Sequence, residues 1–183
     1  MKLKFPLLPE TPESFWARLV MPMAGQERGW MTIPEIGDEV LCAFVHGDIN
    51  NVIVVGSLYN GVDTPPYANE DEENNLRVFQ SRSGHRLTFD DTEGDERVEL
   101  ILFNEEIRVI WDAKDKVISV YSGKDIIIEA GNKIDIKCKD FVLEADSSIS
   151  MDAGQTIGVK AGQAATINGG KMLNMKAATI QLN

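Results

Sequence analysis

The apolar residues in the last third of the chain recur at a fixed spacing. Between residues 118 and 177, two apolar residues and one small residue stand at alternating positions, and this set returns every eight residues. Ile126, Ile128 and Ala130 form one such set. Side chains alternate across a strand, so each set predicts one short strand with an apolar face and a polar face.

A turn former follows the small residue in most copies of this repeat. The copies slip by one residue between Ile134 and Phe141, and the period of eight then resumes. Glycine can adopt positive φ at little cost, which allows a sharp bend. The predicted repeat turns are Gly131, Gly154, Gly162 and Gly170.

The repeat predicts an assembly of several chains. A unit of this size cannot bury its apolar face alone and must stack on its neighbours. A single-chain β-helix needs about twenty residues for each coil, whereas eight residues supply one side and one corner. We therefore expect a homotrimer in which three chains form an intertwined, triple-stranded β-helix, a prism-shaped needle. Its predicted core residues are Ile126, Ile128, Ile134, Ile136, Leu143, Ile149, Met151, Ile157, Val159, Ile167, Leu173 and Met175.

A meander of short antiparallel strands is the alternative for the same stretch. It requires hairpin signals such as Asn-Gly or Asp-Gly between the strands. Only Asn168-Gly169 is present, and it falls inside a repeat. The stacked prism is therefore favoured.

The region before the repeat is also all-β in its pattern. Before residue 60, short apolar runs alternate with Gly and Pro turns and show no helical periodicity, which is typical of a small barrel. Predicted strands lie at 15–20, 39–45, 52–59, 77–80, 86–89, 98–102 and 107–111. Two prolines and an acidic run at 63–75 predict a solvated linker. The expected domains are a barrel at 1–62, this linker, and the needle at 76–183.

The charge and the residue composition exclude some classes of function. The net charge is −11, and residues 1–75 contain twelve acidic and four basic side chains, which argues against nucleic-acid binding. No apolar run is long enough to cross a bilayer, and the N-terminus lacks a signal-peptide pattern. Cys42 and Cys138 lie in apolar strand patterns without metal-like spacing, which predicts buried free thiols.

The sequence offers few candidate catalytic or metal-binding residues. Ser83, His85 and Asp90 could be imagined as a hydrolytic triad, but Gly84 predicts a bend between them, and a triad needs a pocket with oxyanion donors. The acidic turn at 90–96 lacks the order of an EF-hand loop. His46 lies in a predicted turn. We predict no catalytic residue, no cofactor and no metal site.

Several linked motifs resemble those of one family. Residues 15–25 (FWARLVMPMAG), 33–40 (IPEIGDEV), 44–48 (FVHGD) and 55–60 (VGSLYN) resemble the OB-fold domain of the VgrG and phage baseplate spike family. Residues 81–91 (SRSGHRLTFDD) resemble the segment that opens the β-helical needle of that family. Together with the repeat, the resemblance covers nearly the whole chain.

The resemblance implies a structural spike of a contractile injection machine: a type VI secretion system, a phage tail or an extracellular injection particle. It implies baseplate hub and tail-tube proteins as partners, transient contact with a target membrane, and assembly in the bacterial cytoplasm before export. Family members usually carry an extra strand, and many carry a hub domain, before the segment equivalent to residues 1–6. We therefore expect a piece of a longer spike that lacks the N-terminal hub, or a spike whose barrel is completed differently. Histidines occur only at His46 and His85, so the His-x-His iron tip of some phage spikes is not expected.

The last residues still alternate as a strand. Open strand edges and the exposed side chains of Ile180 and Leu182 would invite a partner. The family solution is a PAAR-type tip protein, which we expect to dock there. Two other functions remain open. A spike that also hydrolyses cell-wall glycans would need an inserted domain, and a glycan-binding adhesin would need outward aromatic residues.

Overall fold

The computed structural model describes residues 1–6, 8–9 and 12–181. These residues are all-β, with ten strands, one short 3-10 helix and no α-helix. Among them no helix is long and apolar enough to cross a membrane. The chain divides into two compact units, Met1–Ile128 and Glu129–Asn183. The domain limits expected at 62 and 75 stay a prediction.

A small sheet forms in the first part of the chain. Its strand order is β1-β5-β4, with β1 (Arg18–Leu19) parallel and β4 (Val40–Phe44) antiparallel to the central strand β5 (Val52–Ser57). A bulge between Leu41 and Cys42 shifts the register of β4 against β5. The 3-10 turn η1 (Val45–Gly47) joins the two strands. This mixed sheet is consistent with an OB-like domain.

The core of this region is small. Leu3, Ala17, Val52 and Val54 are buried together, and the partly buried hydrophobic residues Met1, Phe5, Leu19, Val40 and Cys42 surround them. Burial raises the pKa of the Cys42 thiol through desolvation. Cys138 is instead exposed in the single chain, so its burial remains a prediction for an assembly.

The segment that precedes β4 is less regular than its apolar pattern suggests. Of the strand predicted at 15–20, only Arg18 and Leu19 pair, and Phe15 and Trp16 are exposed. A short hairpin forms between β1 and β4, where β2 (Ala24–Gly25) pairs with β3 (Arg28–Gly29).

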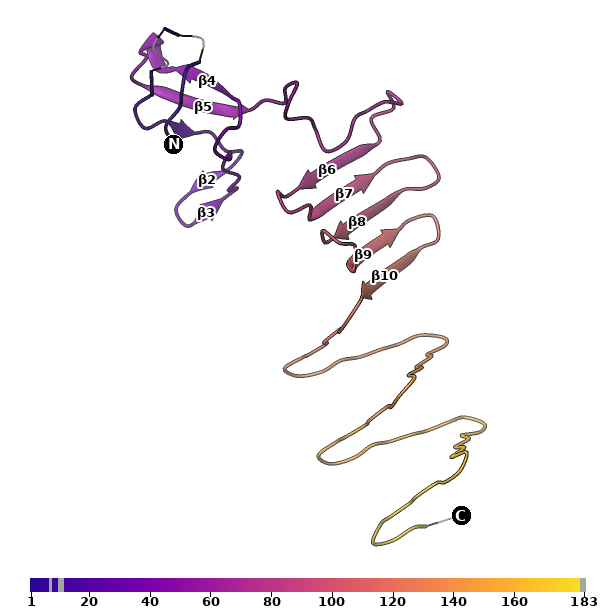
Figure 1. The fold of residues 1–183 in the computed structure, drawn as a ribbon. Helices are drawn as coiled ribbons and strands as arrows, with labels where there is room; N and C mark the ends of the chain where they lie inside the picture. Colours follow the sequence, from indigo (N-terminus) through magenta and orange to yellow (C-terminus); the bar gives the residue numbers. More distant parts are fainter. Residues whose placement is uncertain (7, 10–11, 182–183) are drawn as a thin grey trace. The chain divides into compact units, whose positions relative to one another are not determined.

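A five-stranded antiparallel sheet follows in simple sequential order, β10-β9-β8-β7-β6 (Figure 1). Its strands are β6 (Leu76–Gln80), β7 (Arg86–Asp90), β8 (Arg97–Ile101), β9 (Ile107–Asp112) and β10 (Val117–Ser122). The bounds of each of these five strands agree to within a residue or two with those of a strand, or of the first repeat, predicted from the sequence. Residues 63–75, before this sheet, contain only turns and bends and are almost entirely exposed.

No strand is present in the described residues after Ser122 (Figure 1, orange to yellow). The backbone bends at 123, 131, 139, 146, 154, 162, 170 and 178. These positions are eight residues apart except for one step of seven, from 139 to 146. The bends therefore follow the period of the sequence repeat, including its single slip.

Candidate functional site

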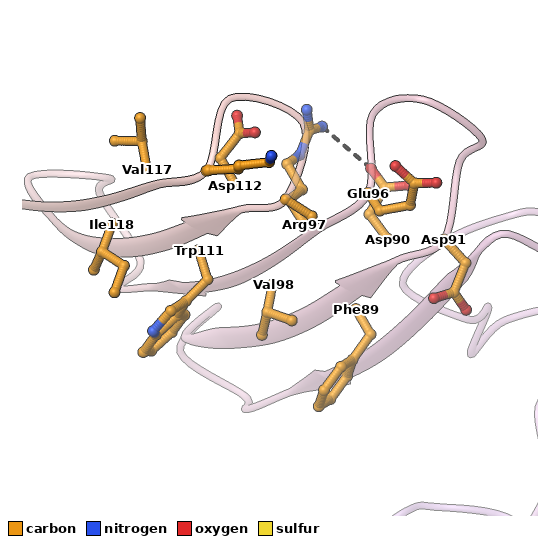
Figure 2. Close-up of a pocket in the computed structure, with 12 residues that line it drawn as sticks. Phe89, Asp90, Asp91, Glu96, Arg97, Val98, Trp111, Asp112, Val117 and Ile118 are labelled. Atoms are coloured by element: carbon orange, nitrogen blue, oxygen red, sulfur yellow. Dashed lines mark ion pairs between the residues drawn. The ribbon is translucent and has the colours of Figure 1, made fainter.

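One face of the five-stranded sheet is apolar and uncovered. Phe89 pairs with Val98, Val98 with Trp111, and Trp111 with Ile118, so one side chain from each of four strands forms a row. Figure 2 shows these four side chains on the same side of the ribbon. Trp111 is 42% exposed and Ile118 is 68% exposed. This row, the apolar row, is too large to be an ordinary scatter of exposed hydrophobic residues.

A second row lies beside the first on the same face. Register pairs connect Phe79 with Leu87, Leu87 with Leu100, Leu100 with Val109 and Val109 with Val120. Residues two apart on a strand share a face, which places this row next to the apolar row. This face is thus apolar across β7 to β10 in both rows, while on β6 Phe79 is apolar and Arg77, the register partner of Phe89, is charged.

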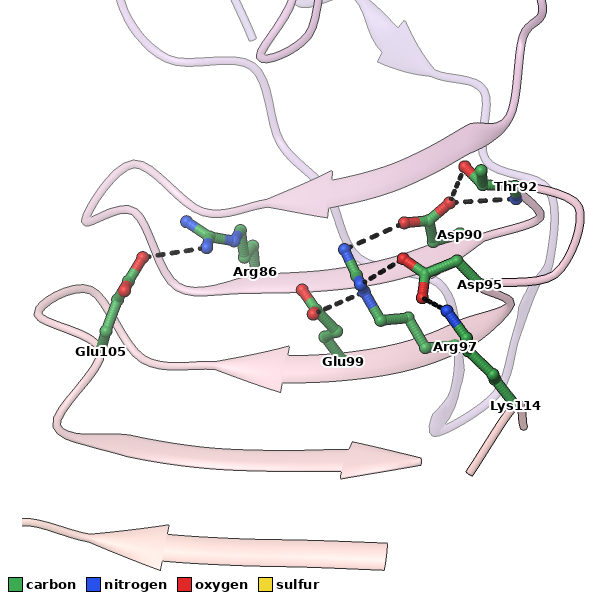
Figure 3. Close-up of polar contacts among 8 residues, drawn as sticks. All are labelled: Arg86, Asp90, Thr92, Asp95, Arg97, Glu99, Glu105 and Lys114. Carbon is green, nitrogen blue, oxygen red and sulfur yellow. Dashed lines mark hydrogen bonds and ion pairs between the residues drawn. The ribbon is translucent and has the colours of Figure 1, made fainter. Parts of the chain in front are cut away.

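The opposite face carries an ion-pair cluster around Arg97 (Figure 3). The Arg97 guanidinium lies 3.2 Å from Asp90, 3.0 Å from Asp95 and 3.0 Å from Glu99. Lys114 approaches Asp95 at 3.4 Å. The Glu99 oxygen forms an ion pair with Arg97 Nε without the geometry of a hydrogen bond. This cluster connects β7, β8 and the turn between them.

Asp90 is the most buried member of the cluster, with a side chain only 9% exposed. The Thr92 hydroxyl donates a hydrogen bond of 2.6 Å to its carboxylate, and the Thr92 backbone N–H donates another of 3.1 Å. The pKa of Asp90 is lowered, chiefly by the hydroxyl hydrogen bond, while burial opposes this and Arg97 adds to it. Asp90 is therefore a structural anion that locks the turn after β7.

The residues of the imagined triad do not come together. Ser83 lies in the turn before β7, and His85 Nδ1 accepts a hydrogen bond of 3.1 Å from the backbone N–H of Phe103. Asp90 stands at the far end of β7, where Thr92 and Arg97 hold it. A nucleophile, base and orienting acid need direct hydrogen bonds to one another, so these three residues do not form a catalytic unit.

The described residues also provide little support for a metal site or a substrate pocket. No group of three or more His, Cys, Asp or Glu side chains in them could hold a metal ion. A shallow hollow at the turn end of the sheet is lined by both faces, with Phe89 and Trp111 on one side and Asp90 and Asp112 on the other (Figure 2). Side chains that leave a sheet on opposite faces cannot enclose one substrate.

The twelve predicted needle-core residues are all exposed in the single chain, by 50% to 80%. No backbone ladder connects their segments, and their apolar side chains lack cover from within the described part of the chain. Of the four predicted repeat turns, Gly170 alone has a positive φ, 58°. Gly131, Gly154 and Gly162 lie at bends, and an added Cβ there would meet no neighbouring atom within 4 Å.

Of the two predicted tip residues, Ile180 is 50% exposed. Leu182 lies outside the described residues.

Sequence reasoning missed the apolar face of the sheet and the Arg97 cluster. The signal was present in the alternation of Leu87 and Phe89 with Thr88 and Asp90, and again in β8 and β9. The pairing that places these residues in rows depends on the hairpin register, which the alternation alone does not give.

Parts of the chain are similar to known proteins. Residues 1–59 match the family model of the type VI secretion system/phage-baseplate injector OB domain. The chain is 32% identical over 104 residues to the type VI secretion system spike protein VgrG3 of Vibrio cholerae, which covers 55% of this chain and 10% of that protein. It is 27% identical over 152 residues to the actin cross-linking toxin VgrG1 of Vibrio cholerae, covering 66% of this chain and 14% of the toxin.

A third relative matches a shorter segment more closely. The type VI secretion system spike protein VgrG1a of Pseudomonas aeruginosa is 43% identical over 54 residues, or 30% of this chain and 8% of that protein. The matched region thus spans between 8% and 14% of the length of these relatives.

Proposed function

The chain belongs to the VgrG spike family, and from this premise we propose that it forms the barrel and needle of a structural spike. Sheath contraction in a type VI secretion system, a phage tail or an extracellular injection particle would drive this spike through a target envelope. The main support is the apolar row, which lies uncovered on a sheet whose five strands are already paired within one chain. Such a surface favours assembly over catalysis.

We propose that three copies bring their apolar faces together around one axis. The repeat supports this closure, because its bends recur every eight residues and each unit supplies only one side of a layer. Closure would pair strand segments of 123–181 with the other two chains and remove the open edges. A trimeric β-helix is therefore the architecture that this sequence pattern favours.

The energy available for such closure is large. Fully burying one Val, Leu, Ile, Phe or Met side chain contributes about 1.5–3 kcal/mol. Twelve needle-core residues that are 50% to 80% exposed in the single chain could gain a substantial part of this contribution each. A single chain has no other way to cover them within its described residues.

We assign the domains from the sequence pattern. Residues 1–62 would form a collar that docks to baseplate hub and tail-tube proteins, 63–75 a linker, and 76–183 the needle. A PAAR-type tip protein would bind the end of the needle, where Ile180 is exposed. The assembly would form in the bacterial cytoplasm and leave the cell on contraction.

A structural role is also supported by the arrangement of the polar residues. His85 and Asp90 hold separate contacts, and Ser83 lies in the turn before β7. The toxin activity in the printed name of one relative is said of that protein, of which this chain matches 14%. No contact in the described residues favours the alternative of a cell-wall hydrolase.

Native mass spectrometry together with circular dichroism tests the proposal. We expect a mass of three chains that persists on dilution, with a β-sheet spectrum that requires the assembled state. A monomer that retains the full β-sheet spectrum would overturn the spike model, because its apolar faces would then be stable in water.

A further inference from the structure

The charges of the final part of the repeat differ from those of the rest of the chain. Residues 153–183 contain Lys160, Lys171 and Lys176 and no acidic residue. All 29 acidic residues, with 15 of the 18 basic ones, lie in residues 1–152. An acidic chain thus contains one segment in which every charged side chain is basic, and we call residues 153–183 the basic segment.

The lysines of the basic segment are exposed and unpaired. In the preceding stretch, Lys133 and Lys137 lie 2.7 Å and 3.9 Å from the Asp135 carboxylate. Within residues 153–181, by contrast, no carboxylate side chain is available, and the three lysines make no ion pair. Their ammonium groups therefore remain free to meet anions from outside.

The spacing of the lysines places them on the outer side of the proposed needle. Lys160 and Lys176 directly follow the predicted core residues Val159 and Met175, so by strand alternation they point away from the core. Lys171 lies at the bend after Gly170. Met172 is exposed and lies four residues before Lys176. Residues an even number apart share a face of a strand, so Met172 would add an apolar side chain to the outer side.

We propose that the basic segment binds the phosphate groups of anionic lipids at a membrane surface. This inference rests on the proposed trimer, in which the three lysines of each chain would form a ring of outward ammonium groups around the needle. Lysine side chains at a membrane interface can place their stems along apolar surface and their ammonium groups among the headgroups.

Two properties favour a lipid surface over a nucleic acid. Binding of single-stranded nucleic acid relies on aromatic side chains that stack with bases, and residues 153–183 contain no Phe, Tyr or Trp. An exposed methionine beside lysines suits an interface that offers both phosphate and apolar groups. Screening over about 8 Å at physiological salt limits the effect of the acidic residues that lie far from the basic segment.

Vesicle co-sedimentation of the full chain tests this inference. The probes are phosphatidylcholine vesicles with and without about a third of phosphatidylglycerol. We expect binding to the anionic vesicles alone, with loss at high salt. Each lysine near an anionic surface contributes roughly a fivefold increase in partitioning. The triple variant Lys160→Gln, Lys171→Gln, Lys176→Gln should therefore bind at least tenfold more weakly, by the same reasoning.

The matched control is Lys124→Gln, Lys133→Gln, Lys137→Gln, which removes the same charge from the mixed stretch and should bind like the unmodified chain. Equal losses in both variants, binding to neutral vesicles, or equally effective competition by duplex DNA would overturn the inference. The mass of each sample by light scattering separates the two proposals. A trimer that ignores anionic vesicles contradicts lipid binding alone, whereas a monomer contradicts the spike architecture.

Discussion

Trp111 and Ile118 face one another across β9 and β10 as register partners, and both side chains are uncovered on the same face of the sheet. Tyr121, on β10, lies on the opposite face, where the Arg108 guanidinium stands 4.7 Å from the centre of its ring. Two aromatic residues on neighbouring strands thus have similar exposure in one chain but different neighbours. This contrast separates the uncovered apolar face, which we propose as the assembly face, from the opposite face.

The first prediction uses this contrast. Trp111→Asp should prevent trimer formation, because it would place three carboxylates in an apolar interface, at a cost of several kcal/mol each. Tyr121→Asp should leave the trimer intact and lose only the contact with Arg108, which contributes about 0.5–1 kcal/mol at an exposed site. Light scattering measures both. Equal disruption by the two substitutions would mean that the apolar row is not an interface.

A second prediction concerns the needle. Val159→Asp should abolish or strongly weaken the trimer, since a buried unpaired carboxylate costs several kcal/mol. Lys160→Asp, one position further, should change the thermal unfolding temperature very little. Native mass spectrometry and thermal unfolding of both variants provide the measurement. The predicted register is wrong if the two substitutions have the same effect.

The repeat shows how much could be predicted from the sequence. The period of eight and its slip near Ile134 and Phe141 are visible in the apolar pattern, and the backbone bends occur with the same period. Periodicity is a local property, so a single sequence is enough to reveal it. Contacts between chains are not a local property, so a periodic pattern does not specify them, and Ile157 and Val159 are exposed in the single chain.

Two features of the structured region were not predictable for physical reasons. Phe15 and Trp16 have strand-like character but lie exposed outside a strand, because apolar composition does not distinguish a loop from a paired segment. Arg97 meets Asp90 and Glu99 only through the pairing of β7 with β8 and the spacing along β8. Charge partners of this kind depend on register, which the turn geometry sets.

The third prediction concerns pH. Asp90 has a lowered pKa in the folded chain, so its ionised form stabilises the sheet above the ordinary aspartate value of 3.8. That stabilisation is lost as the pH falls through the lowered pKa. Asp90→Asn should lower the free energy of unfolding by roughly 1–3 kcal/mol at neutral pH and flatten its dependence on pH below about 4.

Denaturant unfolding at several pH values measures this effect. Asp91→Asn is the matched control, because the Asp91 side chain is 65% exposed and only meets Arg77 at 3.4 Å. It should change stability by less than about 1 kcal/mol. A control variant that lost as much stability as Asp90→Asn would contradict a special role for the buried carboxylate.

The last prediction concerns the tip. Ile180 is 50% exposed and follows the alternation of the final strand pattern, so we expect it to contribute an apolar contact to a PAAR-type protein bound there. Ile180→Asp should weaken that binding by more than tenfold, because an apolar contact is replaced by a desolvated charge. Thr179→Asp adds the same charge at the neighbouring position of opposite parity and should have a smaller effect. A pull-down and a titration with a PAAR-type protein from the same source, on samples shown to be trimeric, provide the measurement. Undiminished binding by Ile180→Asp would place the tip protein elsewhere on the needle.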